Sequence, residues 1–307
     1  MNGPVPIGRS SVGGDQHRRH YGVQAATSVY VGVMTVPRRV FDAHFHIIDP
    51  AHPLVENDGF LPDPFTVADY RARVAHLGAT PDRESPTTEE SAFTIAGGAV
   101  VSGSFQAFDQ GYLVEALRAL GPSFVGVTQL PADTPDARIL ELAEAGVRAV
   151  RFNVARGGSA QLDDLDRFAR RVHDLAGWHT ELYIDARTID SELAGRIVAL
   201  PAVSIDHLGM HADGLPTLLR LVERGVKVKA TGFGRVDLDP AEAARRIVDT
   251  DSRALMVGTD LPSTRARRPF ADDDLRLIES VLTPAEADAV FWDNAAAFYL
   301  GEVGTRE

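Results

Sequence analysis

Two imidazole side chains lie two residues apart in the stretch FDAHFHIIDP, at His44 and His46. The stretch is typical of a buried strand, where side chains two residues apart share one face and their Cα atoms lie about 7 Å apart. The two rings can therefore converge on one atom, either a metal ion or the reacting group of a substrate. As a third possibility, the two histidines are core residues whose ring nitrogens are hydrogen-bonded within the protein. The same alternation predicts that Asp42 lies on the histidine face and that Phe41 and Ala43 lie on the other.

The composition excludes several other chemistries. The 307 residues carry a formal net charge of −12, which repels polyanions, so nucleic acid is not an expected partner. A small anionic substrate is compatible with this charge if arginines cluster locally. The chain has no cysteine, so a disulfide framework, a thiolate nucleophile and Cys-ligated zinc are all excluded, and a reducing cytoplasm is the expected location. No apolar run reaches about 18 residues, so no membrane-spanning helix is expected.

Short apolar runs alternate with helical patterns from about residue 40 to residue 300. Helices are predicted to begin at caps such as Thr66, Thr134 and Thr283 and to end at glycines such as Gly78 and Gly146. Eight runs rich in β-branched residues are predicted strands, at 40–47, 99–105, 124–130, 147–154, 180–185, 203–207, 226–231 and 254–259. Eight βα units in this length predict an α/β protein with a (β/α)8 TIM barrel. A doubly wound sheet is less favoured because no G-x-G-x-x-G follows a strand.

The ends of the chain differ from this pattern. Residues 1–38 are polar and glycine-rich without periodicity, and we predict a disordered leader there, followed by the barrel domain at 39–307. Met34 would be a natural beginning for a compact domain, so we hypothesise that residues 1–33 are dispensable. The polar stretch 82–92 is expected to be a surface loop.

In a TIM barrel, the side chains at the C-terminal ends of the strands form the active site. Asp260 closes the last strand, which neighbours the first, so it is expected beside the histidine pair. Asp206 has the opposite strand parity to His207 and is expected to be structural. The candidate site residues at these ends are His44, His46, Arg151, Arg156, Tyr183, His207, Arg235, Asp260 and Ser263.

Four motifs, DAHFHIIDP, GVRAVRFNV, VSIDHLG and GTDLP, carry a resemblance to a known family. With them the sequence resembles the amidohydrolase superfamily, and more closely the amidohydrolase-2 group that includes 2-pyrone-4,6-dicarboxylate lactonases. The motifs span nearly all of residues 40–300. The resemblance implies a hydrolase that opens a carboxylate-bearing lactone, with a small anionic cyclic substrate. A monomer or homodimer is the expected assembly.

The resemblance also implies roles for individual residues. His44, His46, His207 and Asp260 match the active-site positions, with Asp260 as general base and the three histidines stabilising the oxyanion. The candidate substrate-binding residues are Arg151, which matches an arginine that holds a substrate carboxylate, and Tyr183, Arg235, Arg156 and Ser263.

Whether a metal is needed is the main alternative left open. Metal-dependent members usually add a histidine after the fifth strand and a bridging ligand on the fourth, where this chain has Tyr183 and Arg151. The arginine adds positive charge, which disfavours a cation and favours an anionic substrate. We therefore expect no required metal. The alternative is one divalent ion, Zn²⁺, bound by His44, His46, Asp260 and His207 in a zinc-dependent hydrolase or decarboxylase acting on a small aromatic or cyclic acid.

Overall fold

The computed structural model describes residues 1, 37–75, 77 and 93–301. The chain divides into two units, Met1–Met34 and Thr35–Glu307, and the description below concerns the second. Nearly all of the predicted leader and the whole predicted loop at 82–92 lie outside the described residues. The domain boundary after residue 38 therefore stays a prediction. None of the helices in the described part of the chain is long and apolar enough to cross a membrane.

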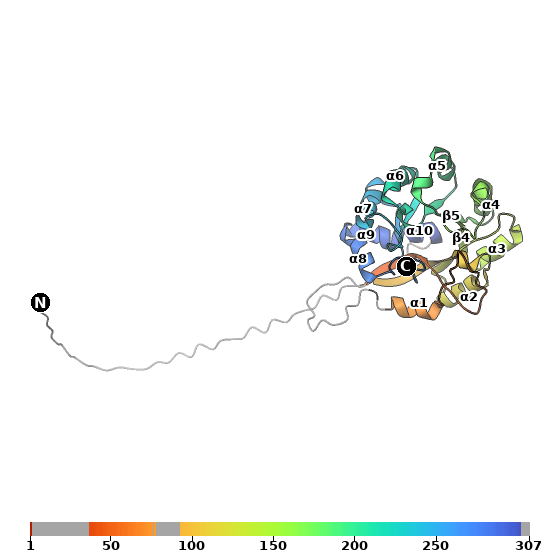
Figure 1. The fold of residues 1–307 in the computed structure, drawn as a ribbon, viewed down its shortest axis with the longest axis horizontal. Coiled ribbons are helices and arrows are strands. Elements are labelled where there is room, and N and C mark those ends of the chain that lie inside the picture. The colour runs from red at the N-terminus through yellow and green to blue at the C-terminus, as the bar shows by residue number, and fades with distance from the viewer. Residues whose placement is uncertain (2–36, 76, 78–92, 302–307) are drawn as a thin grey trace, which may run out of the picture. The chain divides into compact units, whose positions relative to one another are not determined.

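Eight parallel strands form one sheet in sequence order, each hydrogen-bonded to the next, and helices surround them (Figure 1). All eight predicted strands are present, and the prediction of a (β/α)8 barrel is confirmed. The strands are β1 (Arg38–Phe45), β2 (Phe93–Val101), β3 (Phe124–Thr128), β4 (Val147–Asn153), β5 (His179–Tyr183), β6 (Val203–Ile205), β7 (Lys227–Ala230) and β8 (Leu255–Val257).

The helices follow the strands in the alternation that the sequence predicted. Thr66 and Thr283 each form a capping box at a helix start, with Asp69 and Glu286, which satisfies backbone N–H groups that have no partner inside the helix. The helices are α1 (Val67–Val74), α2 (Gly111–Leu120), α3 (Asp136–Glu144), α4 (Leu165–Ala176), α5 (Ser191–Val198), α6 (Leu215–Val222), α7 (Pro240–Thr250), α8 (Asp272–Ser280), α9 (Pro284–Asp288) and α10 (Asn294–Leu300). A π-helical turn, Ala289–Asp293, joins α9 to α10.

The segment after β8 runs beside the end of β1 and nearly closes the barrel. The backbone N–H of Asp260 donates to the carbonyl of His44 at 2.7 Å, and that of His46 donates to the carbonyl of Leu261 at 2.7 Å. These two hydrogen bonds place Asp260 level with the two histidines. The first and last strands are therefore neighbours, as predicted.

The predicted face of Asp42 is wrong, and a bulge in β1 is the reason. Asp42 pairs with Gly98 of β2 and Phe45 pairs with Val100, so Ala43 and His44 together face one residue, Ala99. One extra residue reverses the alternation, as β-bulges do. Asp42 therefore points out of the barrel towards α1, while the histidines point in. Phe41 and Ala43 pack instead with interior residues of other strands, namely Ala99, Val101, Val125, Val127, Ala149 and Met256.

The second strand begins six residues earlier than predicted, because Gly97 and Gly98 lie inside it. A Cβ atom at Gly97 would lie 2.7 Å from the carbonyl oxygen of Ser123, and one at Gly98 would lie 2.8 Å from that of Asp42. Glycine pairs usually interrupt strands, but here they allow two neighbouring strands to approach closely.

α10 covers the N-terminal end of the barrel interior. The ring of Tyr299 stacks on Phe41 with centroids 5.3 Å apart, and its hydroxyl donates to Glu181 at 2.6 Å. Phe298 lies against His179, the first residue of β5. One end of the barrel is thus filled by side chains, which leaves the C-terminal end for the site.

Asp42 joins β1, α1 and the segment after β8 through buried hydrogen bonds. Its carboxylate accepts from Thr259 N–H at 2.8 Å, from Thr259 Oγ1 at 2.7 Å and from the Tyr70 hydroxyl at 3.0 Å. Burial raises the pKa of Asp42 to about 6, although these hydrogen bonds oppose the rise. Since Thr259 precedes Asp260, this contact also fixes the backbone that carries a candidate catalytic residue.

Replacing Asp42 with alanine should therefore lower the free energy of unfolding by about 3 kcal/mol, because three buried donors lose their acceptor. Urea unfolding of Asp42→Ala and the parent protein measures this. Asp163→Ala, at an exposed site, serves as the control. Equal unfolding midpoints for the two variants would contradict the role given to Asp42.

Candidate active site

The structure brings the four predicted catalytic residues together at the C-terminal end of the barrel. His44, His46, His207 and Asp260 are each at most 4% exposed. The Nε2 atoms of His44 and His46 lie 3.8 and 3.6 Å from Oδ1 of Asp260. The His44 ring lies 5.0 Å from the His46 ring and 4.9 Å from the His207 ring, centroid to centroid. The four side chains therefore surround one small volume.

Sharp backbone turns aim two of these side chains. Asp260 and His207 follow β8 and β6 and have positive φ values of 58° and 51°, which non-glycine residues rarely adopt. Such strain concentrates at functional sites. Gly232 gives His207 room, because a Cβ there would lie 2.6 Å from His207 Nδ1. Burial lowers the pKa of His207 well below its usual value, so this imidazole is neutral at pH 7.

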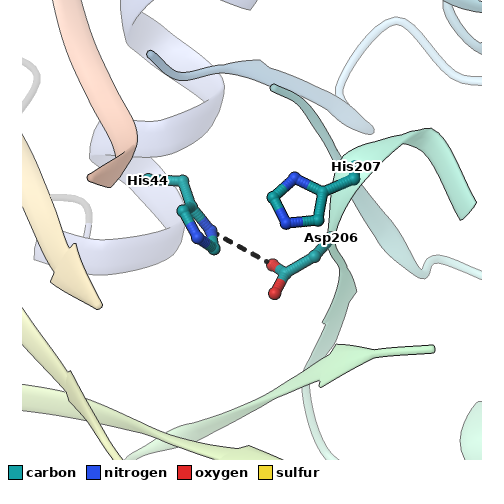
Figure 2. Close-up of side chains that lie close together, drawn as sticks. All are labelled: His44, Asp206 and His207. Atoms are coloured by element: carbon teal, nitrogen blue, oxygen red, sulfur yellow. Dashed lines mark ion pairs between the residues drawn. The ribbon is translucent and has the colours of Figure 1, made fainter. Parts of the chain in front are cut away.

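Asp206, expected to be structural, lies at the centre of the site. Figure 2 shows its carboxylate directed at the His44 ring, with the His207 ring beside it; Oδ1 lies 3.4 Å from His44 Nδ1. Its other oxygen, Oδ2, accepts two hydrogen bonds from Arg151, at 2.8 and 3.2 Å. Asp206 therefore orients one predicted catalytic residue and one predicted substrate-binding residue at once.

Two further charged residues support Asp206 from inside the barrel. Lys229 Nζ lies 3.5 Å from Asp206 Oδ1 and also forms an ion pair with Glu181. All three side chains are fully buried. Burial alone would raise the pKa of Asp206, but Lys229, His44 and Arg151 hold it well below its usual range. Asp206 is therefore ionised, and its negative charge favours the tautomer of His44 that carries the proton on Nδ1.

Arg235 forms the closest contact with Asp260. Its Nε donates to Asp260 Oδ2 at 2.6 Å. Burial alone would raise the pKa of Asp260, but the positive charge of Arg235 holds it well below its usual range. Asp260 is thus ionised at neutral pH, with Oδ1 free to face the histidines.

A pocket of about 350 Å³, counting its open mouth, leads to these residues. Four arginines contribute to it, so the pocket is suited to an anion even though the whole chain is acidic. Its lining residues are His46, Gly103, Ser104, Phe105, Arg151, Asn153, Arg156, Tyr183, His207, Arg235, Thr264 and Arg265. Four of the five predicted substrate-binding residues are among them: Arg151, Arg156, Tyr183 and Arg235.

The fifth, Ser263, lies outside this lining. Its hydroxyl accepts from the backbone N–H of Phe270 at 2.9 Å, and its own N–H donates to the carbonyl of Asp260 at 2.6 Å. These contacts hold the loop after β8 in shape. They favour a role in anchoring that loop over contact with a substrate.

The residues also fit a divalent cation. His46 Nδ1 lies 2.7 Å from the carbonyl oxygen of Val101, an acceptor only, so Nδ1 carries the proton and Nε2 faces Asp260. Two acceptors that face each other at 3.6 Å call for a proton or a cation between them. Ligand atoms of a tetrahedral zinc site lie about 3.4 Å apart. Among the residues that the structure describes, the buried His44 Nε2 and Asp260 Oδ1 have no hydrogen-bond partner, so His44, His46 and Asp260 could hold such an ion.

Sequence reasoning missed Asp206, Lys229 and Glu181 as parts of the site. The alternation of side chains along a strand placed Asp206 and His207 on opposite faces. The left-handed turn at His207 instead lets both residues face the site. The sequence did contain a signal for these residues. All three are ionisable and lie in or beside short apolar strands, where a buried charge needs a partner of opposite charge.

The neutral state of buried His44 predicts a pH dependence of stability. Burial lowers the pKa of His44 to about 4, from an ordinary value near 6.5. Between these values the unfolded chain binds a proton that the folded chain does not, so stability falls as the pH drops from 6.5 to 4. From pH 7.5 to 5.0, His44 should account for about 2 kcal/mol of the loss.

Urea unfolding of chelator-treated protein at both pH values checks this. His44→Asn should lose about 2 kcal/mol less than the parent between pH 7.5 and 5.0, because the asparagine does not titrate. A variant whose loss equals that of the parent would show that His44 takes up its proton equally easily in the folded state.

Comparison with known proteins agrees with the fold and shows the family. The amidohydrolase-2 family model, described as "Amidohydrolase", matches residues 41–300. The chain is 26% identical over 268 residues to a 2-pyrone-4,6-dicarboxylate hydrolase of Comamonas testosteroni, which covers 78% of this chain and 82% of that protein.

Two solved structures share the fold. An Agrobacterium tumefaciens protein aligns with a TM-score of 0.71 at 20% identity, over 86% of this chain and 96% of that one. An Acinetobacter baumannii protein, named "probable 2-pyrone-4,6-dicarboxylic acid hydrolase" and solved with citric acid bound, aligns with a TM-score of 0.69 at 18% identity, over 85% and 98%. With its eight-stranded barrel and a family match over most of its length, the chain belongs to the amidohydrolase family of hydrolases.

Proposed function

We propose that this hydrolase opens the ester bond of a lactone in a small cyclic acid that carries carboxylate. The observation that carries the proposal is the pocket in which His46 and His207, beside the Asp260 carboxylate, lie among four arginines. An ester needs a base and an oxyanion stabiliser, and a carboxylated ring needs cations to hold it. The Comamonas protein is named as a pyrone dicarboxylate hydrolase and the Acinetobacter protein as a "probable" one, and both names support the same substrate class.

In this proposal, Asp260 takes a proton from a water molecule that attacks the lactone carbonyl. Its ion pair with Arg235 keeps it ionised but also weakens it as a base, since the positive charge stabilises the carboxylate. A substrate carboxylate that competes for Arg235 would relieve this effect. Arg235 would then link substrate binding to the basicity of Asp260.

The histidines take different roles in this scheme. Neutral His207 can donate one hydrogen bond to the oxyanion. The proton that Asp260 took from water then passes to the leaving oxygen, with His207 as the relay, so that both groups return to their starting states. His46 donates from Nδ1 to the carbonyl of Val101, so its Nε2 faces Asp260 as an acceptor and does not take the expected oxyanion role. His44 also departs from that role. Its Nδ1 faces Asp206 and burial keeps it neutral, so its Nε2 is suited to accept a hydrogen bond from the attacking water.

Arg151 and Arg235 would hold a substrate carboxylate, with Tyr183 as one wall of the pocket and Arg156 at its mouth. The Arg151 guanidinium lies 5.1 Å from the Tyr183 ring centroid, and both groups line the same pocket. Three of the five N–H groups of Arg151 already donate to Asp206 and to the carbonyl of Ser102. The other two have no acceptor in the described part of the chain and remain for a ligand.

Asp260→Asn should lower kcat by about 10²–10⁴ while KM changes by only a few-fold, because the variant loses the base but keeps the carboxylate clamp. A panel of lactones with and without carboxylate, followed by proton release, measures both constants. Asp174→Asn, at an exposed aspartate, is the matched control. Near-parental turnover in Asp260→Asn would rule out Asp260 as the base.

The second candidate is a zinc-dependent hydrolase or decarboxylase, and the unpaired His44 Nε2 and Asp260 Oδ1 are the observation that favours it. A bound ion would polarise the substrate carbonyl and lower the pKa of a water molecule. We propose that no metal is required, since Arg235 already neutralises Asp260 and the nearby arginines disfavour a cation.

Metal analysis of the purified protein, with the lactone panel repeated after chelation, separates the two candidates. We expect less than one equivalent of metal per chain and unchanged proton release after chelation. One equivalent of zinc, with activity lost on chelation and restored by zinc, would contradict the metal-free proposal.

A further inference from the structure

The interior of the barrel has an apolar half and a charged half. Strands β1, β2 and β3 contribute apolar side chains such as Phe41 and Val127. Strands β5 and β7 contribute Glu181 and Lys229, which are fully buried and form an ion pair. Such a pair adds little stability over apolar side chains of similar size, because the desolvation of its charges offsets their attraction. The presence of this pair therefore points to another role.

Glu181 is held from the end of the barrel opposite the site. Its Oε1 accepts from the Tyr299 hydroxyl at 2.6 Å and lies 3.2 Å from His179 Nε2. Tyr299 belongs to α10 and stacks on Phe41, so packing fixes the position of its hydroxyl. The second oxygen, Oε2, is left for Lys229.

Lys229 lies between two carboxylates and is closer to one of them. Its Nζ donates to Glu181 Oε2 but lies 3.5 Å from Asp206 Oδ1. Because α10 holds Glu181, the ammonium stays with Glu181. Among the described residues, Asp206 Oδ1 has no hydrogen-bond donor, and it faces His44 Nδ1 at 3.4 Å (Figure 2). The negative charge of this oxygen therefore acts on the His44 ring.

We propose that Glu181 is a positioning residue that keeps the Lys229 ammonium away from Asp206. The tautomer of a histidine depends on the partner of each ring nitrogen. An ammonium bound to Asp206 Oδ1 would neutralise the carboxylate and repel a proton on His44 Nδ1. The proton would then move to Nε2. The inference rests on the proposed function only for its effect on catalysis, in which His44 Nε2 accepts from the attacking water.

Glu181→Gln tests this without turnover, because the amide keeps the shape of the side chain but has no charge to hold Lys229. The ammonium should then move to Asp206. Nitrogen NMR of chelator-treated protein with isotope-labelled histidine shows which ring nitrogen carries the proton. We expect His44 to be protonated mainly on Nδ1 in the parent and mainly on Nε2 in the variant. His44→Asn identifies the signals by their loss.

Turnover of lactones should follow the tautomer. Glu181→Gln should lower kcat by about 10- to 100-fold, the usual effect of losing a residue that orients a functional histidine. KM should change by only about twofold, because Arg151 binds the other oxygen of Asp206. The double variant Glu181→Gln, Lys229→Met also removes the displaced ammonium and keeps the interior charges balanced. Its kcat should exceed that of the single variant by at least about fivefold, and its His44 should return to the Nδ1 tautomer.

Two further variants separate positioning from general stability. Glu192→Gln, at an exposed glutamate, is the matched control and should keep the parental tautomer and turnover. Tyr299→Phe changes no charge but frees one oxygen of Glu181, so it should shift His44 towards the Nε2 tautomer to a smaller extent. It also tests the inference if Glu181→Gln does not fold. His44 protonated on Nδ1 in every variant, or a double variant no faster than the single one, would overturn the inference.

The outcome is separate from that of the proposed function. A tautomer that depends on Glu181, in a protein that opens no lactone, would support the positioning role and reject the lactonase proposal. Lactone turnover with an unchanged tautomer would do the reverse.

Discussion

A single buried carboxylate, that of Asp206, links most of the groups on which the site depends. One oxygen lies near His44 and Lys229, and the other binds Arg151. Removing one member of such a network leaves a buried charge without its partner, which is strongly destabilising. Through Lys229, Glu181 and Tyr299 the network reaches α10, which fills the opposite end of the barrel. The geometry of the histidines and the filling of the barrel interior are therefore parts of one arrangement.

Charge is distributed unevenly along the depth of the pocket. At its base, Asp206, Glu181 and Asp260 are balanced by Arg151, Lys229 and Arg235. Towards the mouth, Arg156 and Arg265 add positive charge that the protein balances only weakly. A chain with a net charge of −12 thus presents a local attraction for small anions. A neutral substrate would gain little from this arrangement.

Much of the fold followed from sequence because local signals and the required burial agreed. Caps such as Thr66 and β-branched runs predicted both the elements and their order. The errors came where tertiary contacts overrode local pattern. Gly97 and Gly98 lie within β2 because Ser123 and Asp42 approach them closely. In the same way, the bulge at Ala43 and His44 reverses the alternation that placed Asp42 beside the histidines.

Strand-end position and motif resemblance together located His44, His46, His207 and Asp260, but could not assign their protonation or partners. Those depend on contacts with residues distant in sequence, such as Asp206 and Val101. The central claim is that the site opens lactones that carry carboxylate. Proton release from a carboxylated lactone and from its neutral methyl ester, at equal concentration, tests it most directly. The account predicts that kcat/KM is at least about 100-fold higher for the acid, as two charge-assisted contacts imply. Equal rates for acid and ester, or hydrolysis of neither, would contradict it.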